Sequence, residues 1–149
     1  SREDFEQGFA TGWSDNTVDT TSTCADFFSW HLGGYGNWGR GSGAVKTYEL
    51  MSIPHTQVKV SLDYLVIDSW DNEDGFVILD GTEIYRRRFA HRNGIGNRCG
   101  SRWGEHSPQF VNATLAHTDN TLTLEVRADL HEVALDESFG VDNILIYVR

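Results

Sequence analysis

Apolar residues recur at every second position in several stretches of this chain, and this alternation constrains its fold more than any other feature. In residues 57–67, and again in residues 121–128, apolar side chains alternate with polar ones. A period of two is typical of β-strands with one buried face. Towards the end of the first stretch, Leu65 and Ile67 make the second face apolar as well. No stretch of ten or more residues shows convincing helical periodicity, so the sequence predicts an all-β protein.

Further strands are predicted between glycine-rich and Asn/Asp turns. Asp80-Gly81 lies between apolar residues 76–79 and residues 83–85, and predicts a hairpin because Asp-Gly adopts the positive φ angles of a two-residue turn. The other predicted strands are residues 26–32, 44–50, 109–116 and 141–148. We therefore expect an antiparallel β-sandwich of jelly-roll type, with residues 1–149 as a single domain. The predicted loops 33–43 and 91–107 are long, and binding residues are expected there.

The charge balance excludes one class of partner. With 22 Asp and Glu against 12 Lys and Arg, the net charge is −10. Nucleic acid is therefore not expected as a ligand, because phosphate binding requires a basic surface. No apolar run approaches the ~20 residues of a membrane span, so we expect no direct membrane insertion. The opening Ser1-Arg2 reads as the start of a mature or excised fragment.

The two cysteines, Cys24 and Cys99, are enough for one disulfide and too few for a cysteine-based zinc site. Both sit in polar, glycine-rich stretches rather than in apolar strands. We therefore favour a bridge, which would add ~4 kcal/mol in the chain-entropy model, over two unpaired thiols.

The two ends of the chain carry matching motifs. The chain opens Asp4-Phe5-Glu6-Gln7-Gly8-Phe9 with Gly12-Trp13 close behind, and closes Val141-Asp142-Asn143-Ile144-Leu145-Ile146. These motifs resemble those of MAM-type domains and of carbohydrate-binding-module jelly rolls. The internal runs 68–73, 99–105 and 136–140 resemble jelly-roll modules repeated in secreted and surface proteins of protists. MAM domains usually carry four cysteines, and this chain departs from them with two.

The resemblance implies an extracellular, non-catalytic module that often holds structural Ca²⁺. It places one calcium ligand at Glu6 and another at Asp142, which paired first and last strands would bring together. Ca²⁺ takes 6–8 oxygen ligands and tolerates irregular geometry, so loop carbonyls would complete the shell.

A second set of acidic residues follows the long predicted strand, in what reads as a turn ended by Gly75. Its candidate ligands are Asp68, Asp71, Glu73 and Asp74, with Asp136 and Glu137 of another turn in reach. Crowded carboxylates repel one another without a cation. The alternative is that these residues, and Asn72 among them, are solvated turn formers.

Aromatic side chains in the predicted loops are candidates for stacking on sugar rings. They are Tyr35, Trp38, Trp70 and Trp103, and Arg40 lies in the same loop as the first two. Sugars present apolar C–H faces to aromatic rings, while Asn, Asp and Arg bond their hydroxyls. The alternative is that each Trp folds back over the end of the sandwich, since Trp is mostly buried.

Arginines stand out against the acidic background. They are Arg86, Arg87, Arg88, Arg92, Arg98 and Arg102. Their forked side chains suit carboxylates and sulfates, so Arg88 and Arg92 are candidate contacts to an anionic glycan. The alternative, which we favour, is that most of these arginines pair with acids of neighbouring strands. Asn112-Ala113-Thr114 is a glycosylation sequon.

Catalytic signals are few. No HExxH zinc motif and no Gly-x-Ser-x-Gly elbow is present. We expect an extracellular calcium-binding recognition module, secreted or at the cell surface, within a larger multidomain protein. Its expected partner is a glycan or a cell-surface glycoprotein. The alternatives are a MAM-like adhesion or assembly module, a structural spacer, and a polysaccharide-cleaving enzyme using residues such as Tyr85, Arg88 and His91.

Overall fold

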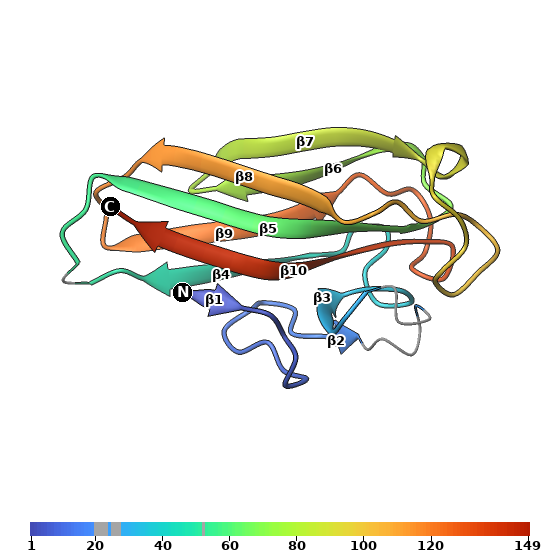
Figure 1. The fold of residues 1–149 in the computed structure, drawn as a ribbon, viewed down its shortest axis with the longest axis horizontal. Helices are drawn as coiled ribbons and strands as arrows, with labels where there is room; N and C mark the ends of the chain where they lie inside the picture. Colours follow the sequence, from blue (N-terminus) through green and yellow to red (C-terminus); the bar gives the residue numbers. More distant parts are fainter. Residues whose placement is uncertain (20–23, 25–27, 52) are drawn as a thin grey trace.

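The computed structural model describes residues 1–19, 24, 28–51 and 53–149. The described strands, labelled in Figure 1, are β1 (Arg2–Glu3), β2 (Val18–Asp19), β3 (His31–Gly33), β4 (Gly43–Glu49), β5 (Gln57–Asp68), β6 (Asp71–Leu79), β7 (Thr82–Ala90), β8 (Gln109–Ala116), β9 (Thr121–Ala128) and β10 (Glu137–Val148). A 3₁₀ turn, η2, spans His91–Asn93. No helix in the described part of the chain is long and apolar enough to cross a membrane.

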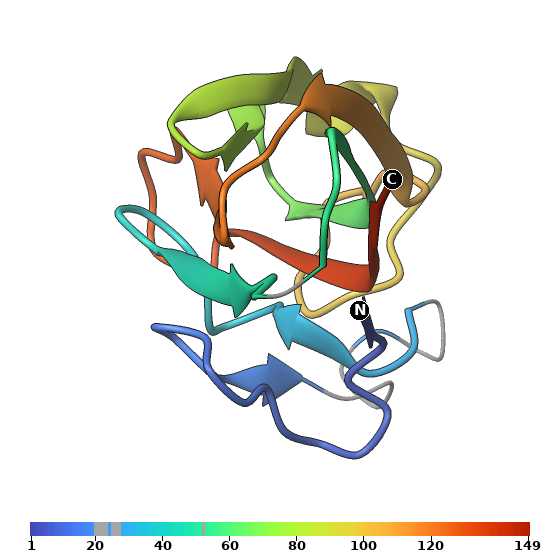
Figure 2. The same cartoon turned by 90° about the vertical axis from the view of Figure 1, so that its left-hand side faces the viewer.

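The strands form two antiparallel sheets, which confirms the expected sandwich. One sheet, here called sheet A, has the order β2-β3-β10-β5-β8, and β1 also pairs with β10. The other, sheet B, has the order β4-β9-β6-β7. The end-on view of Figure 2 shows the blue N-terminal segment along the lower edge of the molecule.

The predicted strands 44–50, 57–67, 109–116 and 121–128 are confirmed to within a residue or two, whereas β6 begins five residues before, and β7 ends five residues after, the predicted 76–79 and 83–85. The Asp80-Gly81 hairpin is confirmed too: Leu79 pairs with Thr82, and the two turn residues have φ of 46° and 76°. The last strand is longer than expected, since β10 begins at Glu137. The predicted strand 26–32 lies partly outside the described residues, and only its end is seen, in β3.

The core lies between the two sheets and is built from the alternating side chains that the sequence indicated. The inward residues of β5, from Val58 to Val66, are fully buried, as are Leu122, Leu124 and Val126 of β9. Their neighbours in the core include Leu32, Trp38, Trp70, Val77 and Phe139.

The two ends of the chain lie side by side, as expected from their motifs. In β1, Arg2 pairs with Leu145 of β10 and Glu3 pairs with Ile144. The N-terminal ammonium of Ser1 donates to the carbonyl oxygen of Ile146 at 2.8 Å. The first residues therefore extend sheet A next to its last strand.

A second, smaller apolar cluster covers one end of the outer face of sheet A. Leu65 and Ile67 of β5 point outward and pack against Phe28, Cys24 and Cys99. The two cysteines form a disulfide that joins positions 75 residues apart, which confirms the predicted bridge. The apolar second face of β5 noted in the sequence is thus the floor of this disulfide-linked cluster.

Candidate functional site

The uncovered part of the outer face of sheet A is polar and open to solvent. It is formed by β5, β8 and β10, which lie towards the viewer in Figure 1. Antiparallel partners share a face. Lys59 therefore lies between Thr114 and Tyr147, and Asp63 lies beside Phe110. We call this surface the open face.

Two aromatic rings project from the open face. Phe110 is 68% exposed and Tyr147 is 58% exposed, although apolar side chains elsewhere on these strands are largely buried. The register puts them four residues apart along the strands and two strands apart across the sheet. Standard strand dimensions then separate them by about 16 Å. The exposed Lys59 lies between the two strands that carry them, and Ser61, although at an outward position, is only 7% exposed.

Two hollows flank these rings. One, of about 470 Å³, is lined by Gln57, Lys59, Thr114, Tyr147, Val148 and Arg149. The other, of about 170 Å³, lies where the disulfide-linked cluster ends, and is lined by Phe28, Ser29, Asp63, Leu65, Pro108, Asp142 and Asn143. The open face is therefore concave at both ends and carries donors and acceptors throughout.

Sequence reasoning missed both rings, although a signal was present. In residues 109–116 the outward positions are Phe110, Asn112, Thr114 and Ala116, so Phe110 is a large apolar residue on an otherwise polar or small side. Tyr147 likewise occupies an exposed position of the last strand. A lone aromatic on the polar side of an alternating strand is the pattern that would have found them.

Two of the predicted sugar-stacking residues are in the core, and that part of the interpretation is wrong. Trp38 and Trp70 have no exposed surface. The Trp70 indole N–H donates to the carbonyl of Ser138 at 2.8 Å, and Trp38 packs against Phe139 with ring centroids 5.2 Å apart. Both side chains fold back between the sheets, which is the alternative that the sequence left open.

The other predicted aromatics lie at the loop end of the sandwich, at the right of Figure 1. Trp103 is half-buried and contacts His91, with ring centroids 4.5 Å apart. His91 Nδ1 lies 3.3 Å from a carboxylate oxygen of Asp71. Arg92 donates to the side-chain oxygen of Asn72 at 3.3 Å. These side chains form a second, more crowded polar surface.

Tyr35 and Arg40 come from the 33–43 loop at the same end. Tyr35 packs against the disulfide-linked cluster, and burial raises the pKa of its hydroxyl. The exposed side chain of Arg40 donates to the carbonyl of His131 at 3.4 Å. Neither shares a described contact with Trp103, so the loop-end candidates do not form one continuous aromatic platform.

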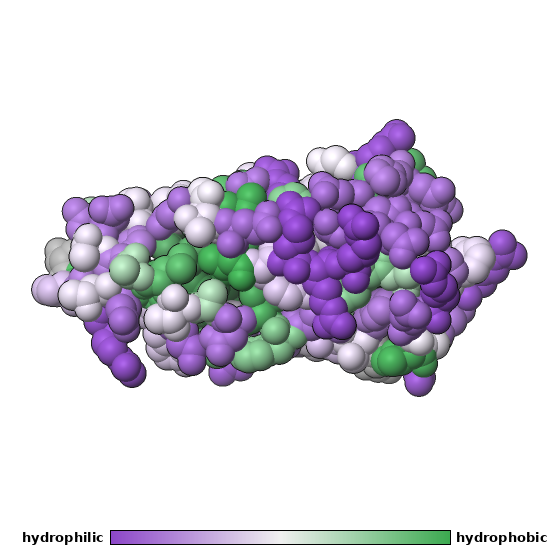
Figure 3. Space-filling model, turned by 90° about the horizontal axis from the view of Figure 1, so that it is seen from above, coloured by the Kyte–Doolittle hydropathy of each residue, from purple (hydrophilic) through white to green (hydrophobic). Residues whose placement is uncertain are grey.

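The arginines of β7 are engaged by neighbouring strands. Arg86 lies 3.2 Å and Arg88 2.9 Å from the Asp74 carboxylate. Their hydrogen bonds hold the pKa of that carboxyl below its usual range. Arg87 donates to Gln109 at 2.7 Å and so links the two sheets. Figure 3 looks onto this edge, where hydrophilic side chains gather over the half nearer the loop end. Pairing with acids of neighbouring strands, the alternative we favoured, holds for Arg86 and Arg88, whereas the partner of Arg87 is an amide.

The acidic run after β5 is not a turn, and that prediction is wrong. Strand β6 begins at Asp71, so the run is divided among different environments. Asp68 is buried and accepts hydrogen bonds from the hydroxyl and backbone N–H of Ser101 at 3.0 and 3.2 Å. Asp74 is held by the arginines, while Asp71 is exposed. The four acids therefore do not surround one cation.

The structure does bring together two predicted metal ligands from separate strands. Glu73 of β6 and Glu137 of β10 are 4% and 1% exposed. Burial, together with the nearby charge of Glu73, raises the pKa of Glu137 to about 7. One oxygen of Glu137 accepts from the backbone N–H of Glu132 at 3.2 Å, and the other has no hydrogen-bond partner among the described residues. Asp136 lies in the preceding turn with an exposed side chain.

The predicted end-to-end carboxylates are also neighbours. Asp142 is 5% exposed, and burial raises its pKa to about 6, with the charges of Glu6 and Asp63 contributing. Its oxygens accept from Ser29 Oγ at 3.0 Å and from the N–H of Asn143 at 2.7 Å. Glu6 is exposed. Across the described ranges, no three His, Cys, Asp or Glu side chains converge as a metal-binding group.

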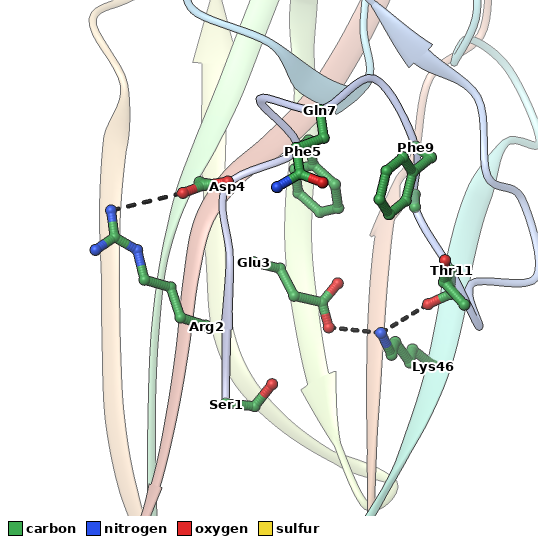
Figure 4. Close-up of a pocket in the computed structure, with 10 residues that line it drawn as sticks. Ser1, Arg2, Glu3, Asp4, Phe5, Gln7, Phe9, Thr11 and Lys46 are labelled. Atoms are coloured by element: carbon green, nitrogen blue, oxygen red, sulfur yellow. Dashed lines mark hydrogen bonds and ion pairs between the residues drawn. The ribbon is translucent and has the colours of Figure 1, made fainter.

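A further hollow, of about 350 Å³, lies beside β1. Figure 4 shows Phe5 and Phe9 on one side of it and Glu3 facing Lys46 on the other. Lys46 Nζ is 2.6 Å from the Glu3 carboxylate and 2.7 Å from the Thr11 carbonyl oxygen. The charged groups of this hollow therefore satisfy one another.

Comparison with known proteins identifies the fold but finds no match at the level of sequence. No protein-family model and no curated protein sequence matches the chain. Among solved structures, the CBM22-1 xylan-binding domain of Paenibacillus barcinonensis Xyn10C is similar with a TM-score of 0.57 at 12% identity, over 99% of this chain and 92% of that one. The fold is that of β-sandwich carbohydrate-binding modules.

Three further structures are similar. The CBM36-1 domain of a multidomain xylanase from the hindgut metagenome of Trinervitermes trinervoides gives a TM-score of 0.51 at 10% identity, covering 100% of this chain and 97% of that chain. A CBM36 module in complex with calcium and xylotriose gives 0.50 at 9% identity, covering 99% of each. Latent PorU from Porphyromonas gingivalis gives 0.52 at 12% identity, covering 78% of this chain but only 12% of that much longer chain.

Proposed function

We propose that this domain binds a glycan on the open face, without catalysing a reaction. The observation that carries the proposal is the pair of exposed rings, Phe110 and Tyr147, standing on an otherwise polar sheet surface. The fold similarity supports it, because neighbours that match over their whole length bear the names of carbohydrate-binding modules.

The chemistry of the open face suits a sugar chain. Aromatic rings stack on the apolar C–H faces of sugars, and flanking polar groups bond the hydroxyls. Lys59 offers donors and Asp63 offers acceptors. A ring separation of about 16 Å exceeds one sugar unit, so we propose that the ligand is an oligosaccharide rather than a monosaccharide.

Binding of xylo-oligosaccharides tests this function, since two of the similar structures are named for xylan or xylotriose. We expect isothermal titration calorimetry to show binding that strengthens with chain length, and a glycan array to extend the ligand set. Phe110→Ala and Tyr147→Ala should each weaken binding at least tenfold, as expected for central aromatic contacts.

Trp103→Ala at the loop end is the matched control, because it removes another aromatic side chain that is not fully buried. Unchanged affinity in this variant, with loss in the other two, supports the open face. The reverse pattern would move the proposed site to the loop end. No binding to any glycan, accompanied by self-association, would instead support an adhesion role.

We also propose that Ca²⁺ stabilises the domain, and two acidic pairs support this. Glu73 with Glu137 offers a buried oxygen that lacks a partner, and Glu6 with Asp142 joins the two ends of the chain. Each pair supplies two carboxylates, so backbone carbonyls or water would complete the shell. When bound, the ion would neutralise carboxylates whose burial otherwise opposes ionisation.

The melting temperature in calcium and in chelator tests this second proposal. A ligand that binds only the native state raises the melting temperature. Glu137→Gln should abolish the increase if the ion lies at the loop end, and Asp142→Asn should abolish it if the ion lies between the termini. An equal melting temperature with calcium and after stripping by chelator would contradict the proposal.

The disulfide supports a location outside the cytosol. Disulfides persist in oxidising compartments and are rare in the cytosol, so we propose that the domain is secreted or displayed at the cell surface. We further propose that it belongs to a larger protein. Detection of the domain in culture medium, in oxidised form, would test the location, and recovery only in the reduced cytosolic fraction would contradict it.

A further inference from the structure

Three connections meet at the end of the sandwich opposite the loop end, at the left of Figure 1. They are the β4–β5 connection, the Asp80-Gly81 turn, and the β8–β9 connection. A histidine from the first, His55, faces a histidine from the third, His117. His55 Nε2 lies 2.8 Å from His117 Nδ1, and the two ring planes differ by 15°.

The outer nitrogen of each ring is held by an oxygen. His55 Nδ1 is 2.6 Å from the carbonyl oxygen of Ile53, and His117 Nε2 is 3.0 Å from the Asp80 carboxylate. The other oxygen of Asp80 accepts from the backbone N–H of Thr123 at 2.7 Å. Protons on the outer nitrogens satisfy both oxygens. The two inner nitrogens then have lone pairs directed towards each other.

We propose that His55 and His117 form a site for a divalent transition-metal ion such as Zn²⁺. Metal-binding histidines characteristically donate their second ring N–H to a carboxylate or a backbone carbonyl, which fixes the ring and its tautomer. Both rings have such a partner here. Imidazole is a preferred ligand of Zn²⁺, Cu²⁺ and Ni²⁺, whereas Ca²⁺ requires oxygen.

The spacing of the inner nitrogens is close to what a metal needs. With Zn–N bonds of 2.0–2.1 Å, two nitrogens on a tetrahedral ion are about 3.3 Å apart. The observed 2.8 Å is shorter by about half an ångström. Binding requires the rings to move apart and to turn so that both lone pairs meet at the ion. His55 can move in this way because it lies in the connection before β5 and is only half-buried. In the absence of metal, one shared proton between the inner nitrogens completes the hydrogen bond.

Open space lies beside the pair. A hollow of about 330 Å³ borders His117 and Asp80 on the side away from His55. Its lining combines the polar side chains of Thr56, Thr82, Thr118 and Asp119 with the apolar ones of Leu79, Leu115 and Ala116. Water, or a side chain of a partner molecule, would occupy the other coordination positions. The net charge of −10 favours a cation.

Titration with Zn²⁺ followed by calorimetry and thermal melting tests the proposal. We expect one equivalent to bind and the melting temperature to rise. His55→Ala and His117→Ala should each weaken binding at least tenfold. Asp80→Asn keeps both histidines but weakens the hydrogen bond that orients His117. It should therefore weaken zinc binding about tenfold, and less than the loss of either histidine does. His131→Ala is the control, because that side chain is 82% exposed and lies apart from the pair.

A spectroscopic readout separates a metal site from a structural role. Cu²⁺ as a probe should show nitrogen coordination by electron paramagnetic resonance in the wild type. His117→Gln, which keeps a donor for Asp80 and so preserves the fold, should lose that signal. Zinc binding that is equal in the wild type, His55→Ala and His117→Gln would overturn the proposal, and so would binding abolished by His131→Ala instead.

Discussion

The two ends of the outer face of sheet A share the same strands and differ in almost everything else. At one end, Leu65 and Ile67 lie under the cluster linked by Cys24 and Cys99. At the other end, β5 presents polar side chains to solvent. The outward residues of β5 therefore change from polar to apolar where the covering segment begins.

Packing within the domain does not explain the exposed rings on the open face. Under the disulfide-linked cluster, outward apolar residues are buried by a cover that the same chain supplies. On the open face no described segment covers Phe110 or Tyr147, which remain exposed. Single exposed apolar residues are common, but here two lie on one face beside two hollows, which supports the proposed binding surface. Variants on either side of the boundary test this division.

Removing the disulfide should destabilise the whole domain. The Cys24→Ser, Cys99→Ser double variant should lose about 4 kcal/mol of unfolding free energy, because the bridge closes a long loop. Urea denaturation measures the change. If the two ends of the face are independent, glycan affinity of the folded variant should be unchanged. A matching loss of affinity would show that the cover shapes the open face.

Shortening an outward side chain should matter only under the cover. Leu65→Ala should cost about 3 kcal/mol, since it leaves a cavity among buried apolar residues. Lys59→Ala, at an outward position of the same strand, should change the free energy of unfolding by less than about 0.5 kcal/mol. Chemical denaturation of both variants gives the comparison. Equal costs would mean that the two ends are packed alike.

The boundary between the two ends should respond to pH through Asp142. Its folded pKa of about 6 lies above the ordinary value of 3.8, so the native state binds the proton more strongly than the unfolded state. The associated stability is full below pH 4 and is lost as the pH rises through about 6. In calcium-free buffer this loss should be about 3 kcal/mol.

Asp142→Asn is the matching variant, because the amide cannot ionise. It should show a smaller decline in the free energy of unfolding between pH 4 and pH 7 than the wild type. Denaturation at several pH values, with chelator present, measures the difference. Identical pH profiles would show that the buried carboxyl does not titrate as described.

The smallest effect on stability is expected at the open face. Tyr147→Ala removes an exposed ring, so the free energy of unfolding should change by less than about 0.5 kcal/mol. Its glycan affinity should nevertheless fall at least tenfold. Parallel denaturation and titration experiments provide this contrast. A large loss of stability would assign the ring a packing role instead.

Most of the sheet could be predicted from the sequence because alternation reports local burial. The strands β5, β8 and β9 and the Asp80-Gly81 turn follow from their own residues. Strand β6 was hidden because its first residues are all polar, although Glu73 points inwards and is buried. Gly75 does not end a turn but lies within β6. A glycine is needed there because a Cβ atom would lie only 2.7 Å from the ring of Tyr64.

The site was harder to predict because a local pattern does not tell which way a turn directs a side chain. Asp68 adopts a positive φ of 69°, and the chain then turns so that Trp70 enters the core. Trp38 is buried in the same way after a glycine-rich loop. The pairing of Glu73 with Glu137, and of His55 with His117, joins residues 64 and 62 positions apart. Only the folded sheets bring such residues together.

Asn112 stands outward on β8, between Phe110 and Thr114 and opposite Ser61, within the glycosylation sequon. An N-linked oligosaccharide attached there would project over the rings and compete with any other sugar for the same surface. Protein made in bacteria and protein made in a glycosylating cell would then differ in which sugars they can bind. The choice of expression host is therefore itself a variable in measuring what this domain recognises.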